Sequence, residues 1–212
     1  MSAFSDFSLE CYTLPIFLPC QRELRWFDTA TQIDKSWSGA RLPLNLAPNS
    51  HLRPWLLDKS SLTAKLITLS RGNFRVQVLR QTYARPSRSE AKALGVAPHH
   101  LSLIREVILE GNNQPWVFAR SVLPLTSLQG RLRHLRKQGT RPLGAFLFSQ
   151  PQLSRSPIAL ALISRHHNYV PEILLGDTPV WGRRSIFYLY GKPLLVSEVF
   201  LSDFPGSSDK AK

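Results

Sequence analysis

The sequence predicts an α+β fold in which helices cover one face of an antiparallel sheet. Several short runs of alternating apolar and polar residues are joined in pairs by tight turns, and strands joined in that way pair antiparallel. The helical patterns come mainly before the first strand and between two hairpins, which is the arrangement of an α+β protein. With 212 residues, 43% of them hydrophobic, the chain can bury a sizeable core and has the usual size of one domain.

The chain divides into an extension, a domain and a tail. Residues 1–50 are rich in Pro, Ser and Asn, so we expect an irregular N-terminal extension that packs on the domain. Residues 51–205 carry the strand and helix patterns and are expected to form the domain, followed by a disordered polar tail at 206–212. Cys11 and Cys20, the only cysteines, are too few for a disulfide framework or a four-cysteine zinc site.

Two short helices are predicted before the sheet. The first covers 52–58. Ser60 is a plausible N-terminal cap for the second helix, which Gly72 ends. The apolar stripe of this second helix is formed by Leu62, Leu66 and Leu69.

The sheet is predicted to begin where apolar residues alternate with polar ones, at Phe74, Val76 and Val78. The clearest hairpin follows. Its strands are 101–110 and 115–123, and the Gly-Asn-Asn-Gln sequence at 111–114 supplies the unusual backbone angles of the turn.

A further helix and a second hairpin complete the domain. The helix has an apolar stripe, with Ser127 as its cap and Gly139 at its end. This stripe is formed by Leu128, Leu132 and Leu135. The second hairpin has strands 185–190 and 194–201 around a turn at 191–193.

Two ionisable residues fall on apolar faces of the predicted strands. Successive side chains in a strand point to opposite sides, so Arg105 shares a face with Leu103 and Val107, and Glu198 shares a face with Val196 and Phe200. Taking an ion out of water costs several kcal/mol even after relaxation. Each of the two charges therefore needs a partner.

Two interpretations of Arg105 and Glu198 are open. In the structural one they pair with each other, or the opposite strand faces form the core and both charges point to solvent. In the functional one they flank a ligand: the guanidinium binds a carboxylate through two hydrogen bonds, and the carboxyl group accepts or moves a proton. An aromatic acid with a para oxygen would satisfy both. The residues alone leave the two interpretations equally open.

Other polar clusters also have a structural interpretation beside the functional one. Arg183 and Arg184 stand at the entrance to a strand, where one of them could point inward beside a pocket, although Arg is more often exposed. The adjacent pairs at 99–100 and 166–167 are the closest His neighbours, but neither has metal-ligand spacing, so we predict no metal site. A solvated helix face, rather than a nucleic-acid site, is expected for Arg131, Arg133, His134, Arg136 and Lys137.

The charge of the chain points to an anionic partner without identifying it. Lys and Arg number 27 against 14 acidic residues, and a net charge of +13 attracts nucleic acid, anionic lipid or an anionic small substrate. No run approaches the roughly 18 to 20 apolar residues of a membrane helix, and the N-terminus does not resemble a signal peptide. We therefore expect a cytoplasmic protein with no membrane span and no nucleic-acid partner.

Three segments resemble the chorismate pyruvate-lyase family of ubiquinone biosynthesis: LIREVILEGNNQPWVFARSVLP, RPLGAFLF and WGRRSIFYLYGKPLLVSEVFL. The resemblance covers roughly 55–205 and is weak or absent before residue 50. It implies a six-stranded antiparallel sheet with helices on one side and an enclosed ligand cavity. It also implies conversion of chorismate into 4-hydroxybenzoate and pyruvate without cofactor or metal.

The resemblance assigns expected roles to single residues. Arg105 resembles the family arginine that pairs with the ring carboxylate, and Glu198 resembles the glutamate at the 4-hydroxyl. Leu143, the leucine of RPLG, resembles a residue that contacts the product. Leu62 corresponds to a methionine that lines the site, a change that conserves volume. The connection 149–180 is longer than we expect in the family.

The resemblance favours the functional interpretation, and we expect a monomer. In the functional interpretation, Arg105 fixes the ring carboxylate, Arg183 or Arg184 binds the enolpyruvyl carboxylate, and Glu198 assists proton transfer. The chief alternative is a non-catalytic sensor of small aromatic acids, because the fold resembles effector domains of some transcription regulators. The Pro-broken residues 1–50 do not look like the DNA-binding helices that precede such domains.

Overall fold

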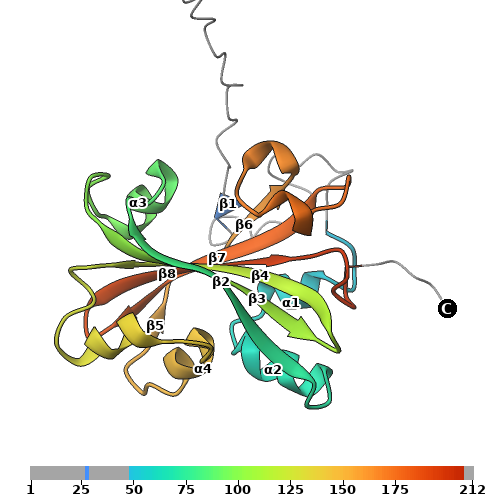
Figure 1. Cartoon of the computed structure of the whole chain (residues 1–212), viewed down its shortest axis with the longest axis horizontal. Coiled ribbons are helices and arrows are strands. Elements are labelled where there is room, and N and C mark those ends of the chain that lie inside the picture. The colour runs from blue at the N-terminus through green and yellow to red at the C-terminus, as the bar shows by residue number, and fades with distance from the viewer. Residues whose placement is uncertain (1–26, 29–47, 208–212) are drawn as a thin grey trace, which may run out of the picture.

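Eight antiparallel strands form one sheet in the computed structural model, which describes residues 27–28 and 48–207. Their spatial order is β1-β6-β7-β8-β4-β3-β2, and β5 also pairs with β7 (Figure 1). The strands are β1 Phe27–Asp28, β2 Phe74–Ala84, β3 Ser102–Gly111, β4 Gln114–Pro124, β5 Ser154–Arg155, β6 Ala159–Ile163, β7 Val180–Leu189 and β8 Lys192–Phe200. The α+β class and the antiparallel sheet are confirmed.

Helices lie on both faces of this sheet (Figure 1). One face, called the inner face below, is covered by α1 Arg53–Leu57, α2 Leu62–Leu69, the 3₁₀ helix η2 Gly130–Lys137 and α4 Leu143–Phe148. The opposite, outer face is covered by α3 Arg88–Leu94 and by the short 3₁₀ helices η3 Arg165–His167 and η4 Glu172–Leu174. The expected helices on one side are thus present, and the outer face carries a further layer of its own.

Both predicted hairpins are present, and residues with positive φ make their turns. Asn112 and Asn113 have φ of 53° and 62° between β3 and β4, where Asn tolerates the left-handed region. The β7–β8 turn uses Tyr190 and Gly191, with φ of 53° and 71°, and is shorter than the predicted 191–193 turn. Strand β7 also begins at Val180, five residues before the expected start at Ser185.

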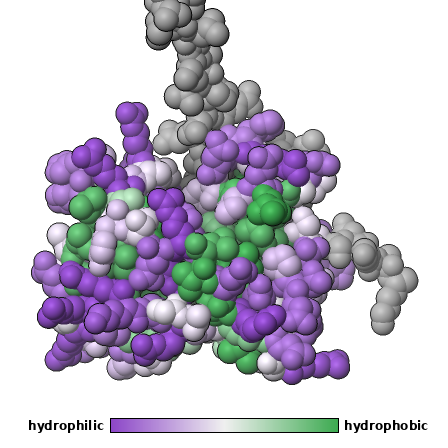
Figure 2. All heavy atoms as spheres, viewed as in Figure 1, coloured by the Kyte–Doolittle hydropathy of each residue, from purple (hydrophilic) through white to green (hydrophobic). Residues whose placement is uncertain are grey.

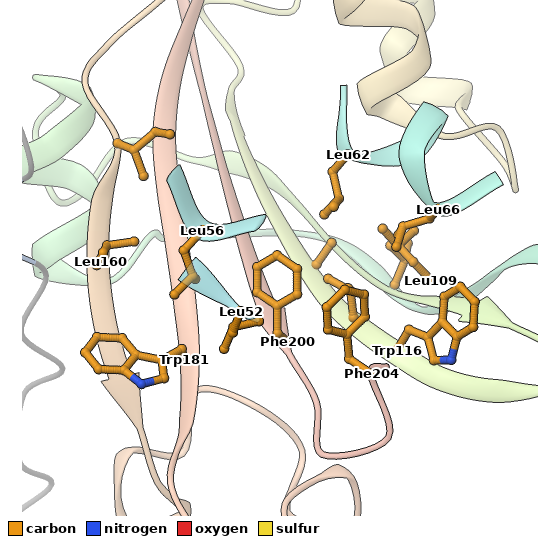
Figure 3. Close-up of a cluster of buried hydrophobic side chains, with 14 residues drawn as sticks. Leu52, Leu56, Leu62, Leu66, Leu109, Trp116, Leu160, Trp181, Phe200 and Phe204 are labelled. Atoms are coloured by element: carbon orange, nitrogen blue, oxygen red, sulfur yellow. The ribbon is translucent and has the colours of Figure 1, made fainter. Parts of the chain in front are cut away.

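The inner-face core joins α1 and α2 to the middle of the sheet. Leu56 and Leu66 are fully buried, at 0% exposure, and pack in one cluster with Phe200 and Phe204 (Figure 3). Full burial of such side chains stabilises the fold by about 2 kcal/mol each. This cluster fixes α2 over the sheet, beside the pocket described below.

The predicted helices form with different caps from those expected. Ser61, not Ser60, caps α2, since its Oγ accepts a hydrogen bond of 3.3 Å from the Ala64 N–H. The 128–135 stripe is buried as predicted, but it belongs to a 3₁₀ helix, and the Ser127 hydroxyl donates to the Pro193 carbonyl instead of capping it.

Three predictions concern the ends of the chain and the membrane. Apart from β1, which pairs with β6, and residues 48–50, the expected extension 1–50 lies outside the described residues. Of the expected tail at 206–212, only Gly206 and Ser207 are described, and the Ser207 hydroxyl donates to the Leu201 carbonyl. None of the helices in the described part of the chain combines the length and apolar character needed to cross a bilayer.

Hydrophilic residues cover most of the face seen in Figure 2, and apolar areas interrupt them near its middle and lower right.

Five residues of η2, which are Arg131, Arg133, His134, Arg136 and Lys137, form the basic stretch noted in the sequence. Arg131, Arg133, His134 and Lys137 are exposed, whereas Leu132 and Leu135 face the core. The expected solvated helix face is present in this segment.

Candidate active site

A pocket lies on the inner face, between the sheet and the helices α2 and α4. It holds about 500 Å³ of space free of atoms, part of which is open to solvent. Most of its lining is apolar, from Leu62 of α2 and Leu143 of α4 to Val107 of β3. Its ionisable lining residues are Arg105 and Glu198. Both charges singled out in the sequence therefore face one pocket.

Arg105 enters this pocket from β3 as a buried cation. Its side chain is 2% exposed, and its Nη2 donates to the backbone carbonyls of Gly139 at 2.8 Å and Arg141 at 3.4 Å. The Nε is buried without a hydrogen-bond partner, and burial lowers the pKa of the guanidinium. Among the described residues no carboxylate forms an ion pair with Arg105. Its charge and its Nε are thus available to a ligand.

Glu198 enters from β8 and is held by Arg183 of β7. Its Oε2 accepts a 2.6 Å hydrogen bond from the Arg183 Nε. The Arg183 side chain is 1% exposed, and its Nη1 donates to the carbonyls of Trp55 at 2.6 Å and Asp58 at 2.7 Å. The backbone carbonyls thus hold Arg183 in place, and Arg183 holds the Glu198 carboxylate, which still lines the pocket.

Arg105 and Glu198 do not pair with each other. Strand β4 lies between them, because Arg105 pairs with Ser121 and Glu198 pairs with Ala119. Two strand spacings and two residues along the strand separate their α-carbons by roughly 12 Å. The structural interpretation, in which the two charges satisfy each other, is therefore wrong, and the charges stand apart across the pocket.

The other predicted site residues divide between the two faces of the sheet. Leu62 and Leu143 line the pocket. Arg183 lies on the inner face, where it donates a hydrogen bond to Glu198. Arg184 points to the outer face, where its Nη1 donates to the Ser89 hydroxyl at 2.8 Å, so the structure does not bring it to the pocket. The alternation of a strand explains why neighbouring arginines separate in this way.

Arg155 of β5 lies beside this site, although the sequence did not identify it. It pairs with Phe187, which lines the pocket, and its guanidinium lies 5.0 Å from the centre of the Phe187 ring. Its Nε donates to the Ser185 hydroxyl at 3.0 Å, and its Nη1 donates to the carbonyls of Lys59 at 3.1 Å and Asp58 at 3.4 Å.

Burial and the nearby Arg183 lower the pKa of Arg155 to about 10, against the opposing effects of Glu198 and Asp58. No pattern in the sequence could have found this residue. Strand β5 has only two residues, too few to show alternation, and Arg155 joins the site through long-range pairing with β7.

Metal ligation has no candidate among the residues that the structure describes, since they contain no group of three or more His, Cys, Asp or Glu side chains placed to hold an ion. The charged groups at the pocket are the Arg105 cation, the Glu198 carboxylate paired with Arg183, and the Arg155 cation beside them. This set can bind an acidic molecule at two points and can accept or return a proton between them.

Known proteins are similar to this chain over most of its length. Residues 42–206 match the family model described as chorismate lyase. A probable chorismate pyruvate-lyase of Azoarcus sp. is 44% identical over 167 residues, covering 74% of this chain and 87% of that protein. Another from Aromatoleum aromaticum is 42% identical over 158 residues, covering 72% of this chain and 85% of that protein.

Among solved structures, the effector domain of PhnF from Mycobacterium smegmatis is similar, with a TM-score of 0.50. It is 17% identical and covers 69% of this chain and 91% of that chain, so the likeness concerns the fold alone. The family model spans most of the chain, and the two relatives align over most of their own length. The chain therefore belongs to the chorismate lyase family.

Proposed function

We propose that this chain is a chorismate pyruvate-lyase that converts chorismate into 4-hydroxybenzoate and pyruvate without a cofactor. The observation that carries the proposal is the buried Arg105, which has no carboxylate partner among the described residues and faces the same pocket as Glu198. A buried cation of this kind is stabilised by a ligand carboxylate. The family resemblance further implies a role in ubiquinone biosynthesis.

In this proposal Arg105 anchors the ring carboxylate of the substrate. A guanidinium can form two parallel hydrogen bonds to a carboxylate, and the Arg105 Nε has no partner of its own. The apolar lining around it, including Leu62, Val107 and Leu143, suits a six-membered carbon ring. Because the ring carboxylate is kept in the product, Arg105 holds substrate and product alike.

Glu198 acts at the other end of the ring. The hydrogen on ring carbon 4 leaves as a proton, its electron pair forms the last double bond of the aromatic ring, and the bond from carbon 3 to the ether oxygen breaks. The departing enolpyruvate takes up a proton and becomes pyruvate. We assign proton transfer at carbon 4 or at the leaving oxygen to Glu198, whose carboxylate Arg183 holds in place.

Aromatisation supplies the driving force, so positioning and exclusion of water are the main tasks of the protein. The direct test is to incubate the purified chain with chorismate and to follow 4-hydroxybenzoate and pyruvate together. Equal amounts of the two, formed well above the uncatalysed rate, are expected. Binding of 4-hydroxybenzoate without turnover of chorismate would instead support the sensor alternative.

A further inference from the structure

A row of charged side chains crosses the inner face of the sheet. Arg105 stands on β3, Glu198 on β8, Arg183 on β7 and Arg155 on β5. The register places Glu198 beside Arg183, and it places Arg155 opposite Phe187, four residues further along β7. Cross-strand partners share a face of the sheet, so Arg155 faces the pocket side. Glu198 therefore has one cation on the β3 side and two on the β7 side.

The cations at the two ends of this row, Arg105 and Arg155, form no ion pair with a carboxylate of the described residues. Glu198 balances the charge of Arg183 at 2.6 Å, and Lys65 balances Asp58 at 2.6 Å. None of the ion pairs within the described residues includes Arg105 or Arg155. Both are held by neutral oxygens, from backbone carbonyls and the Ser185 hydroxyl. Arg105 and Arg155 are thus the two cations of this row without an ion-pair partner among the described residues, and chorismate carries two carboxylates.

The positions of the two cations suit the shape of that substrate. With the ring carboxylate at Arg105 and carbon 4 at Glu198, the ether on the adjacent carbon 3 starts from the Glu198 end of the ring. The Asp58 carbonyl accepts hydrogen bonds from both Arg183 and Arg155, so the Arg155 guanidinium lies just beyond the pair that holds Glu198. Each of these two arginines donates three hydrogen bonds, but Arg183 is paired with the Glu198 carboxylate, whereas Arg155 donates only to neutral oxygens. Arg155 is therefore the cation of the two whose charge a ligand carboxylate would pair.

We propose that Arg155 binds the enolpyruvyl carboxylate of the substrate and so distinguishes the dicarboxylate substrate from the monocarboxylate product. This inference rests on the proposed function, since it assumes that the pocket receives chorismate. It also gives product release a physical basis. Once pyruvate has left, 4-hydroxybenzoate retains the Arg105 anchor and has nothing to offer Arg155.

The test compares three ligands that cannot react. They are 4-hydroxybenzoate, its derivative with a 1-carboxyethenyl ether at carbon 3, and the methyl ester of that derivative on the ether carboxylate. Isothermal titration calorimetry of the wild-type chain should show that the diacid binds more tightly than the ester. In Arg155→Gln this preference should fall roughly tenfold or more, while the affinity for 4-hydroxybenzoate stays within about twofold of wild type.

Two further variants control for charge and for folding. Arg155→Lys keeps a cation and should retain part of the preference for the diacid. Arg184→Gln removes another partly buried arginine, from the outer face of β7, and should bind all three ligands as the wild type does. Thermal unfolding confirms that each variant is folded, and the ratio of two affinities within one variant does not depend on its stability.

An unchanged preference for the diacid in Arg155→Gln would overturn the inference. So would an equal loss of affinity for all three ligands, because that result assigns Arg155 the structural task of holding the 58–59 carbonyls. None of these readouts needs turnover. A wild-type chain that prefers the diacid but leaves chorismate intact would refute the proposed function alone.

Discussion

Arg105 and Glu198 show how much of a site the alternation of a strand can reveal. Each was identified because it shares a strand face with apolar neighbours, and both line the same pocket. Alternation could not reveal their partners. The bond from Arg183 to Glu198 depends on the register between β7 and β8, and Arg155 depends on the pairing of β5 with β7. Register is fixed by the whole sheet, so these contacts became visible only in the structure.

Replacing Arg105 should separate binding from stability. We expect Arg105→Gln to weaken 4-hydroxybenzoate binding by about 2 kcal/mol, because a charged hydrogen bond to the carboxylate is lost. The melting temperature of the ligand-free chain should not fall, since the change removes a buried cation without a carboxylate partner among the described residues. Calorimetry and thermal unfolding measure the two quantities, with the exposed Arg133→Gln as a control. Unaltered affinity for 4-hydroxybenzoate would contradict the anchoring role.

Replacing Glu198 should affect turnover more than binding. The amide in Glu198→Gln keeps an oxygen that can accept the Arg183 hydrogen bond, but it cannot take up a proton. We expect kcat to fall by about 10²- to 10⁴-fold, with KM for chorismate changed by only a few-fold. Steady-state kinetics on chorismate gives both values. A variant with the kcat of wild type would remove the proposed proton role.

At the scale of elements, strong local signals predicted structure and weak ones did not. The β3–β4 hairpin followed from alternation and its Asn-Asn turn. Helix α3 was missed, although Ser87 and Glu90 form a complete capping box and Gly95 ends the helix at φ 67°. Helix α4 has only six residues, and β6 lies in the 149–180 connection, so neither has a repeating pattern long enough to be read.

An ion pair between Glu90 and Arg120 holds helix α3 on the outer face, so the stability of the fold depends on pH. Glu90 is fully buried and accepts a 2.7 Å hydrogen bond from the Nε of Arg120, which also bonds to Glu106. Burial by itself raises the pKa of Glu90, but Arg120 and Ser87 outweigh that effect and lower it overall. A carboxyl with a lowered pKa stabilises the fold above its unfolded pKa of about 4.3, and this contribution is lost as pH falls through the folded pKa.

We therefore expect Glu90→Gln to destabilise the chain at pH 7 by about 3 kcal/mol, since it leaves Arg120 with one carboxylate fewer. The difference from wild type should shrink as pH is lowered below about 4, where the Glu90 contribution disappears from the wild type as well. Urea unfolding at a series of pH values measures this. Glu172→Gln, at a side chain that is 79% exposed, should match the wild type at every pH. A Glu90→Gln deficit that stays constant down to pH 2 would argue against the ionic fastening.

At the scale of the whole molecule, the sheet brings distant parts of the sequence together around one pocket. Arg105 and Glu198 are joined through β4, and helices from separate parts of the sequence, α2 and α4, cover them. The surplus of cations over the chain, with a net charge of +13, suits an anionic substrate. Ligand binding should therefore stabilise the fold as a unit.

Thermal unfolding with 4-hydroxybenzoate tests this coupling. A ligand at about 100 times its Kd stabilises the folded state by about 2.7 kcal/mol. For a chain of this size we expect Tm to rise by about 5 to 10 °C. The control is 4-hydroxybenzamide, which lacks the charge that Arg105 would bind and should give little shift. Equal shifts with the acid and the amide would contradict a site organised around Arg105.

The most direct measurement is a crystal structure of the chain with 4-hydroxybenzoate. The account predicts one molecule in the pocket between α2, α4 and the inner face, with its carboxylate bound by the Arg105 guanidinium and its 4-hydroxyl bound by the Glu198 carboxylate. A ligand in the reverse orientation, or one bound elsewhere while this pocket stays empty, would contradict it.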